Sequence, residues 1–105
     1  MPQYAVYLNK NLRSRSVFPM LVDVQAELLD DLETRIVIPL VKGASFTGFP
    51  LGLLMPTVEF EGESYLLMTP QLAGVSRWDL GPHRGSLAAH SRAIYTAMEI
   101  LLRGF

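Results

Sequence analysis

Apolar and polar residues alternate along much of the chain, and this period of two predicts β-strands with one buried face. In the central block, Val22 and Val24 alternate with Asp23 and Gln25. Further along, Gly62 supplies the positive φ that a tight hairpin turn needs. The pattern predicts strands at residues 4–8, 17–25, 35–41, 57–61, 64–69 and 75–79.

Two segments depart from this alternation. Residues 26–33 form a charged connection that suits a short helical turn and carries two adjacent exposed-looking leucines, Leu28 and Leu29. Residues 42–56 combine glycines and prolines with apolar side chains, a composition that argues against a long helix. We expect short strands or a hairpin arm there. Trp78, within the last expected strand, is interpreted as a core residue.

The end of the chain has helical spacing. Residues 86–103 are predicted to form one helix, with Ser86 as N-cap and Gly104 ending it in left-handed geometry. The order of elements predicts a mainly β fold, a small antiparallel barrel or curled sheet with a C-terminal α-helix packed on it. The apolar stripe of the helix is formed by Ile94, Ala97, Met98 and Leu101.

Composition narrows the class of protein. A length of 105 residues fits a single domain over 1–105, and a hydrophobic fraction of 50% argues against disorder. The net charge of -1 gives no bulk attraction to nucleic acid or to an anionic membrane. The chain has no cysteine, no signal-peptide pattern and no apolar run of the ~20 residues that span a bilayer. We therefore expect a cytoplasmic protein, with an oligomer interface among its apolar surfaces.

Residues with catalytic or metal-binding chemistry are sparse. His83 and His90 lack further ligands at metal spacing, so surface or capping roles are the simpler interpretation. No nucleophile elbow or phosphate loop is present. Three glutamates alternate along the expected hairpin and are interpreted as a solvated face: Glu59, Glu61 and Glu63.

Residues 21–40, residues 55–69 and the glycine after the final helix resemble the CcdB toxin family in their order and spacing. The resemblance covers nearly the whole chain. It implies an SH3-like barrel of the CcdB/MazF type, arranged as a homodimer. It implies the toxin of a type II toxin–antitoxin system, typical of plasmid maintenance, that poisons DNA gyrase through the A subunit without catalysis, metal or cofactor. A CcdA-like antitoxin would neutralise it, and contact with operator DNA and transcription regulation would run through that antitoxin.

The resemblance also implies which residues touch the target. These are the two leucines of the 26–33 connection, Leu28 and Leu29, and residues of the final helix and tail, Glu99, Arg103, Gly104 and Phe105. Toxic members of the family end in Trp-Gly-Ile, whereas this chain ends in Arg-Gly-Phe. Two indoles of a dimer would clamp a target arginine, and two arginines would repel it. We therefore expect weakened or redirected target binding. Without any target, Arg103 is also explained by its i, i+4 pairing with Glu99 and by the helix dipole.

Two further hypotheses come from the basic residues. A MazF-like endoribonuclease on the same barrel would use Arg13, Arg15, Arg77, His83 and His90, although the chain offers no convincing acid/base pair. Alternatively, a basic loop and two aromatic residues would bind the acidic, amphipathic tail of the antitoxin. Those residues are Lys10, Arg13, Arg15, Phe46 and Phe49.

Overall fold

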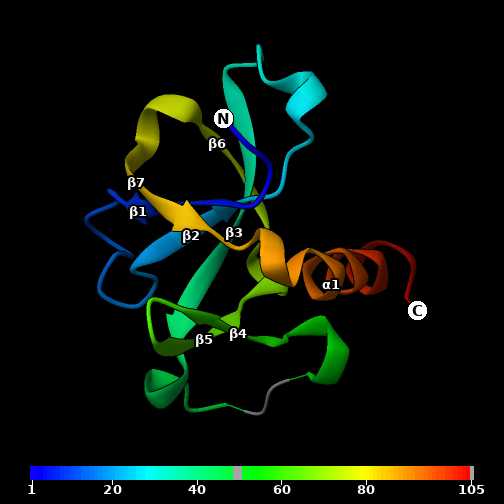
Figure 1. Ribbon diagram of the computed structural model, residues 1–105. Helices are drawn as coiled ribbons and strands as arrows, with labels where there is room; N and C mark the ends of the chain where they lie inside the picture. Colours follow the sequence, from blue (N-terminus) through cyan, green and yellow to red (C-terminus); the bar gives the residue numbers. More distant parts are fainter. Residues whose placement is uncertain (49–50, 105) are drawn as a thin grey trace.

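The computed structural model describes residues 1–48 and 51–104, and it shows an antiparallel half-barrel with one C-terminal helix (Figure 1). The sheet order is β4-β5-β3-β2-β1-β7, and β6 pairs with the first half of β3. The elements are β1 (Ala5–Asn9), β2 (Met20–Asp23), β3 (Thr34–Lys42), β4 (Thr57–Phe60), β5 (Glu63–Leu67), β6 (Ala73–Ser76), β7 (Leu80–Ser86) and α1 (Ser91–Arg103). The predicted fold class is confirmed.

The two faces of the central strands bury different clusters. The main core lies inside the half-barrel, where Ile94 and Ala97 of α1 reach strand residues such as Val22 and Ile38. On the opposite face, the arch from β6 to β7 covers a second cluster, which contains Ala5, Tyr7, Leu21, Val37 and Leu80. Because both faces are covered, β2 is buried along its whole length.

A buried ion pair joins β2 to β3. Arg35 donates from Nε to Asp23 Oδ2 at 2.8 Å, its Nη2 lies 2.8 Å from the same oxygen, and both side chains are 0% exposed. Burial raises the pKa of Asp23, and hydrogen bonds from Gln25 N and from Arg35 act in the opposite direction. Arg35 Nη1 also lies 3.1 Å from Asp30 Oδ1, so the guanidinium holds the connection between the two strands. The alternation of the sequence marked Asp23, Gln25 and Arg35 as the polar face, and all three are buried.

The half-barrel closes between β4 and β7 through side chains. Arg84 donates to Glu61 at 2.7 Å, and a Cβ on Gly85 would lie 3.0 Å from the ring of Phe60. At the other end of β7, a Cβ on Gly81 would lie 2.6 Å from the carbonyl oxygen of Leu8, so only glycine fits against β1. The glycines near residue 81 therefore belong to a strand.

Several local predictions need correction. The strand expected at 17–25 is shorter, because residues 14–18 form turns with hydrogen bonds back to Asn11 and Ser14. Residues 42–56 contain 3-10 turns at Gly43–Ser45 and Gly52–Leu54, and in the described part of this segment only Lys42, the last residue of β3, belongs to a strand. The strand β7 was missed because its glycines and proline resemble a turn. Residues 77–79, expected as strand, form a 3-10 turn, and Trp78 is 72% exposed, so its assignment to the core was wrong.

The turn and helix-end predictions are largely confirmed. Gly62 has a φ of 77° and Gly104 a φ of 83°. The α-helix begins at Ser91, later than residue 86, because Ser86 still belongs to β7. The N-cap prediction for Ser86 was therefore wrong, because His90 is the N-cap of α1. Ser86 Oγ accepts from Ala88 N at 3.0 Å, a local turn bond just before the 3-10 turn Ala88–His90 that leads into α1.

We predict that Asp23→Ala lowers the free energy of unfolding by about 3–5 kcal/mol, because it leaves the Arg35 guanidinium charged and unpaired in the interior. Urea denaturation with a common m-value would measure the change. The matched control is Asp31→Ala, an exposed neighbouring carboxylate, which should change stability by less than about 0.5 kcal/mol. A loss below about 1 kcal/mol for Asp23→Ala would contradict the prediction.

Candidate functional site

The two leucines of the 26–33 connection are presented to solvent by a rigid turn. Glu27–Leu29 is a 3-10 turn in which Leu28 is 94% and Leu29 48% exposed. Gln25 donates from Nε2 to Leu29 O at 3.0 Å and accepts from Ile36 N at 3.1 Å, so a buried side chain fastens the turn to β3. The N-terminal ammonium, 2.7 Å from Asp30 Oδ2, and then Arg35 and Arg77 hold the pKa of Asp30 below its ordinary value. Single exposed leucines are common on protein surfaces, so Leu28 and Leu29 are candidate contacts because the family resemblance places target contacts on this turn.

The last turn of α1 presents the second group of expected target residues. Glu99 and Arg103 form the expected i, i+4 pair, with Arg103 Nη1 3.7 Å from Glu99 Oε2. Gly104 N donates to Ile100 O at 2.8 Å, which completes the left-handed end of the helix. Phe105 lies outside the described residues. The end of α1 therefore presents a charged pair and a completed helix end before any partner binds.

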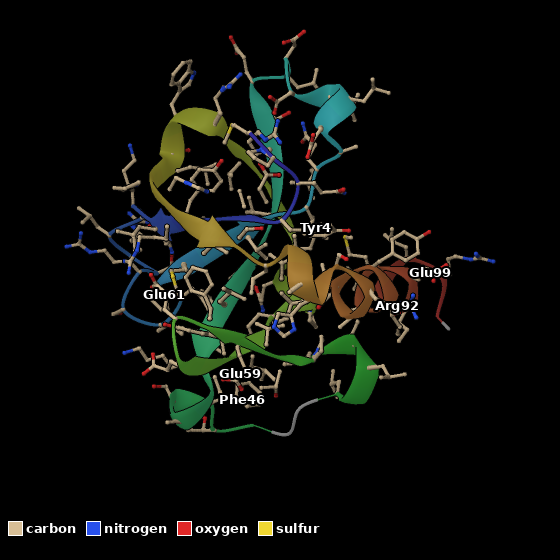
Figure 2. The ribbon with its side chains drawn as sticks, in the orientation of Figure 1. Tyr4, Phe46, Glu59, Glu61, Arg92 and Glu99 are labelled. Atoms are coloured by element: carbon tan, nitrogen blue, oxygen red, sulfur yellow. The ribbon has the colours of Figure 1, made fainter. Side chains whose placement is uncertain are left out.

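The free face of α1 carries a groove that the hydrophobic pattern of the sequence did not predict. Its volume is about 270 Å³, and it is lined by Tyr95, Met98, Glu99, Leu102 and Arg103. Tyr95 is 57% and Leu102 77% exposed. Figure 2 shows Glu99 on this helix, which projects from the half-barrel. The signal was present in the sequence, because Tyr95 and Leu102 are apolar residues outside the buried stripe of the helix.

The basic loop and the arm approach each other without forming one open surface. Lys10, Arg13 and Arg15 are all exposed. Phe46 is half-buried and packs with Phe18, from the end of the loop, against the cluster Val41, Met55 and Leu66. Phe49 lies outside the described residues. The cations are accessible, whereas Phe46 already has apolar neighbours.

Three of the residues proposed for RNA cleavage make structural contacts of their own. Arg77 donates to Asp30 O at 3.4 Å and lies over Trp78, 5.7 Å from the ring centroid. His83 packs on Tyr7, with ring centroids 5.4 Å apart. His90 Nε2 accepts from Glu59 N at 3.4 Å. Each has a local structural role, so the geometry offers no converging acid and base.

The glutamates of the β4–β5 hairpin are on the surface. Glu59, Glu61 and Glu63 are exposed, as predicted for a solvated face, and Ser64 donates to Glu59 at 2.6 Å. Across residues 1–48 and 51–104, no three His, Asp or Glu side chains gather in a way that could hold a metal ion. In the same part of the chain, no helix is long and apolar enough to cross a membrane.

Comparison with known protein families gives one match over nearly the full length. A family model described as "CcdB protein" matches residues 3–104. The matched region includes the η1 turn (Glu27–Leu29), the buried ion pair and all of α1. The exposed leucines and the helix end therefore lie within the family domain.

Proposed function

The chain belongs to the CcdB protein family, and on this premise we propose that it is a type II toxin that binds the A subunit of DNA gyrase and poisons the enzyme. Family membership implies a toxin that acts on gyrase without catalysis, and the structural contacts made by Arg77, His83 and His90 agree with a binding protein. The observation that carries the proposal is the exposure of Leu28 and of the last turn of α1, both of them on well-ordered elements. The proposed site of action is the cytoplasm.

Two surfaces would contact gyrase. One is the η1 turn, with Leu28 and Leu29, and the other is the end of α1, with Glu99, Arg103, Gly104 and Phe105. Figure 1 shows η1 and the end of α1 as separate projections, so they would act as two subsites. Arg103 is 62% exposed on its side chain and has Glu99 beside it, which offsets part of its charge. We infer that Arg103 gives a lower affinity for gyrase than a tryptophan at this position would, because a cation here repels a cation of the target.

Replacing Arg103 by Trp should strengthen gyrase poisoning. Each indole would add a cation–π contact worth about 0.5–2 kcal/mol, so two protomers should lower the toxin concentration needed by at least about fivefold. The measurement is the yield of cleaved DNA in a gyrase cleavage assay against toxin concentration. Arg103→Lys is the control, because it keeps the charge without the ring.

The assay separates two failures. If neither the wild type nor Arg103→Trp traps cleaved DNA, gyrase is not the target. If both trap it at the same concentration, gyrase is the target but Arg103 does not weaken the contact. Relief of killing by a mutation in the gyrase A subunit would identify the target in cells.

We also propose a homodimer that forms through α1. The groove beside Tyr95 and Leu102, together with exposed Leu51 and Leu53 of the neighbouring segment, is a large apolar surface for so small a chain. The turn Gly52–Leu54 packs against α1, so the two apolar regions are adjacent. A two-fold interface would cover the same patch on both copies and place the two helix ends near each other.

Tyr95→Glu should convert the dimer to a monomer, because it would bury two unpaired carboxylates in the interface. Analytical ultracentrifugation at micromolar concentration would show the change in mass. Ser16→Glu is the control, since it places the same carboxylate on an exposed position of the basic loop, outside α1. A Tyr95→Glu protein that sediments as the wild type would exclude this face as the interface.

The partner that neutralises the toxin is proposed to be a CcdA-like antitoxin with an acidic tail. Lys10, Arg13 and Arg15 are exposed on one loop and offer complementary charge, with Phe46 and Phe49 as the proposed apolar contacts. Because the toxin has a net charge of -1, we assign contact with operator DNA to the antitoxin.

Reversing Arg13 and Arg15 to Glu should slow association with the product of the neighbouring reading frame by about tenfold at low salt, because rim charges act mainly on the on-rate. Surface plasmon resonance at two salt concentrations would measure it. Arg92→Glu, which reverses an exposed cation on α1 outside the basic loop, is the control. An unchanged on-rate for the double variant would count against the basic loop.

A further inference from the structure

The outer edge of β6 has backbone groups directed away from the sheet. Val24 N donates to Ile36 O at 2.9 Å, and Ile36 N donates to Gln25, so both backbone groups of Ile36 face β2. Gly74 is paired with Ile36 in the antiparallel register. Hydrogen-bonded and non-hydrogen-bonded pairs alternate along an antiparallel ladder, and the Ile36–Gly74 pair is a non-hydrogen-bonded one. The N–H and C=O of Gly74 must therefore point away from β3, and the N–H of Ser76, two residues on, does the same. Among the described strands, β6 has only β3 as a neighbour.

This edge lacks most of the usual protection against strand addition. Edge strands are normally protected by being very short, or by charged side chains, proline or a bulge, and of these β6 has only its four-residue length. The sequence of β6 is Ala-Gly-Val-Ser, and both Ala73 and Gly74 are exposed. Gly74 has no side chain to cover its own backbone. The edge is therefore short, uncharged and sterically open.

A cavity of about 320 Å³ lies on the face of β6 opposite to that of Gly74. Its lining includes Ala73 and Val75 of β6, Ser14 and Phe18 of the basic loop, and Asp79. A strand added to β6 would direct every second side chain to the face of Ala73 and Val75. A cavity of roughly 150 Å³ suffices for a benzene ring, so one leucine or phenylalanine side chain would fit.

The surrounding charge favours an acidic occupant. Residues 9–18 contain Lys10, Arg13 and Arg15 and no carboxylate, and all three cations are exposed. Asp79 is the single acid among the lining residues. A peptide with carboxylates beside the loop would gain from these cations, whereas a basic peptide would be repelled by them.

We propose that the outer edge of β6 and the cavity under the basic loop bind an extended, acidic segment of the antitoxin as an added β-strand, with one bulky apolar side chain in the cavity. This inference rests on the proposed function, because it takes the antitoxin as its partner. The backbone of Gly74 and Ser76 would supply the main-chain hydrogen bonds of strand addition. The basic loop would set the register of the added strand on β6 and would attract the acidic segment as it approaches.

The test uses the full toxin chain and the purified product of the neighbouring reading frame. Gly74→Pro removes the outward N–H while leaving the hydrogen bonds of Ala73 and Val75 to β3 in place, because proline is tolerated on a free edge. We expect it to weaken binding at least tenfold by calorimetry. Gly74→Ala is the matched control, since it keeps the N–H and its Cβ would meet only Ile36, at 3.6 Å.

Amide hydrogen exchange gives an independent readout on the wild type. Gly74 and Ser76 N–H should exchange at least a hundredfold more slowly in the complex than in the free toxin. The emission of Trp78, the one tryptophan of the chain and 72% exposed just after β6, should shift to shorter wavelength on binding. Both measurements work even if Gly74→Pro were to fold poorly.

The outcomes separate this inference from the proposed function. If no complex forms with the wild type, both fail. If a complex forms but the two amides stay unprotected and Gly74→Pro binds as tightly as Gly74→Ala, only the β6 site is overturned. If Gly74→Pro instead abolishes dimerisation and leaves the antitoxin affinity unchanged, the edge serves a second copy of the chain and the proposal is likewise overturned.

Discussion

The buried pair of Arg35 and Asp23 is the constraint on which the rest of the structure depends. Both side chains are fully removed from water, so each charge is tolerable only because the other is 2.8 Å away. The pair fixes the register of β2 against β3, and the same guanidinium reaches Asp30. The turn that presents Leu28 is thus held by a contact made in the interior. A one-residue slip of either strand would separate the charges, which makes this register specific.

Because both faces of the central strands are covered, the burial of their polar residues is difficult to predict from the sequence. The sequence shows strict alternation around Val22, Val24 and Ile36, which is typical of a sheet with one wet face. In the structure, the polar positions Asp23, Gln25 and Arg35 are buried as well, and they bond to one another and to the neighbouring backbone. Local pattern identified the strands and their inner side chains. It could not reveal the arch formed by β6 and β7, because that cover depends on residues about fifty positions away.

The same distinction explains which parts of the candidate site were foreseen. The exposure of Leu28 and the pairing of Glu99 with Arg103 depend on local spacing, and both were expected from the sequence. The groove beside Tyr95 was not, because a helix pattern shows which face is apolar without showing how far the helix projects from the sheet. Trp78 was misassigned for a related reason: aromatic residues are usually buried, and only the 3-10 turn places it outside. Conversely, the glycines and proline of β7 resemble a turn in the sequence. In the structure, Gly81 is required because the backbone of Leu8 leaves no room for a Cβ.

The closure between β4 and β7 has a consequence for how the molecule moves. Elsewhere neighbouring strands are joined by backbone ladders, but here the described contacts are one half-exposed ion pair and the packing of Phe60 on Gly85. Exposed ion pairs contribute about 0–1 kcal/mol, so this seam should open at a lower free energy than global unfolding. Because β7 leads directly into α1, each such opening would release the base of the helix while the Arg35 pair keeps β2 and β3 together. The helix and the η1 turn would then fluctuate as separate cooperative units of one small domain.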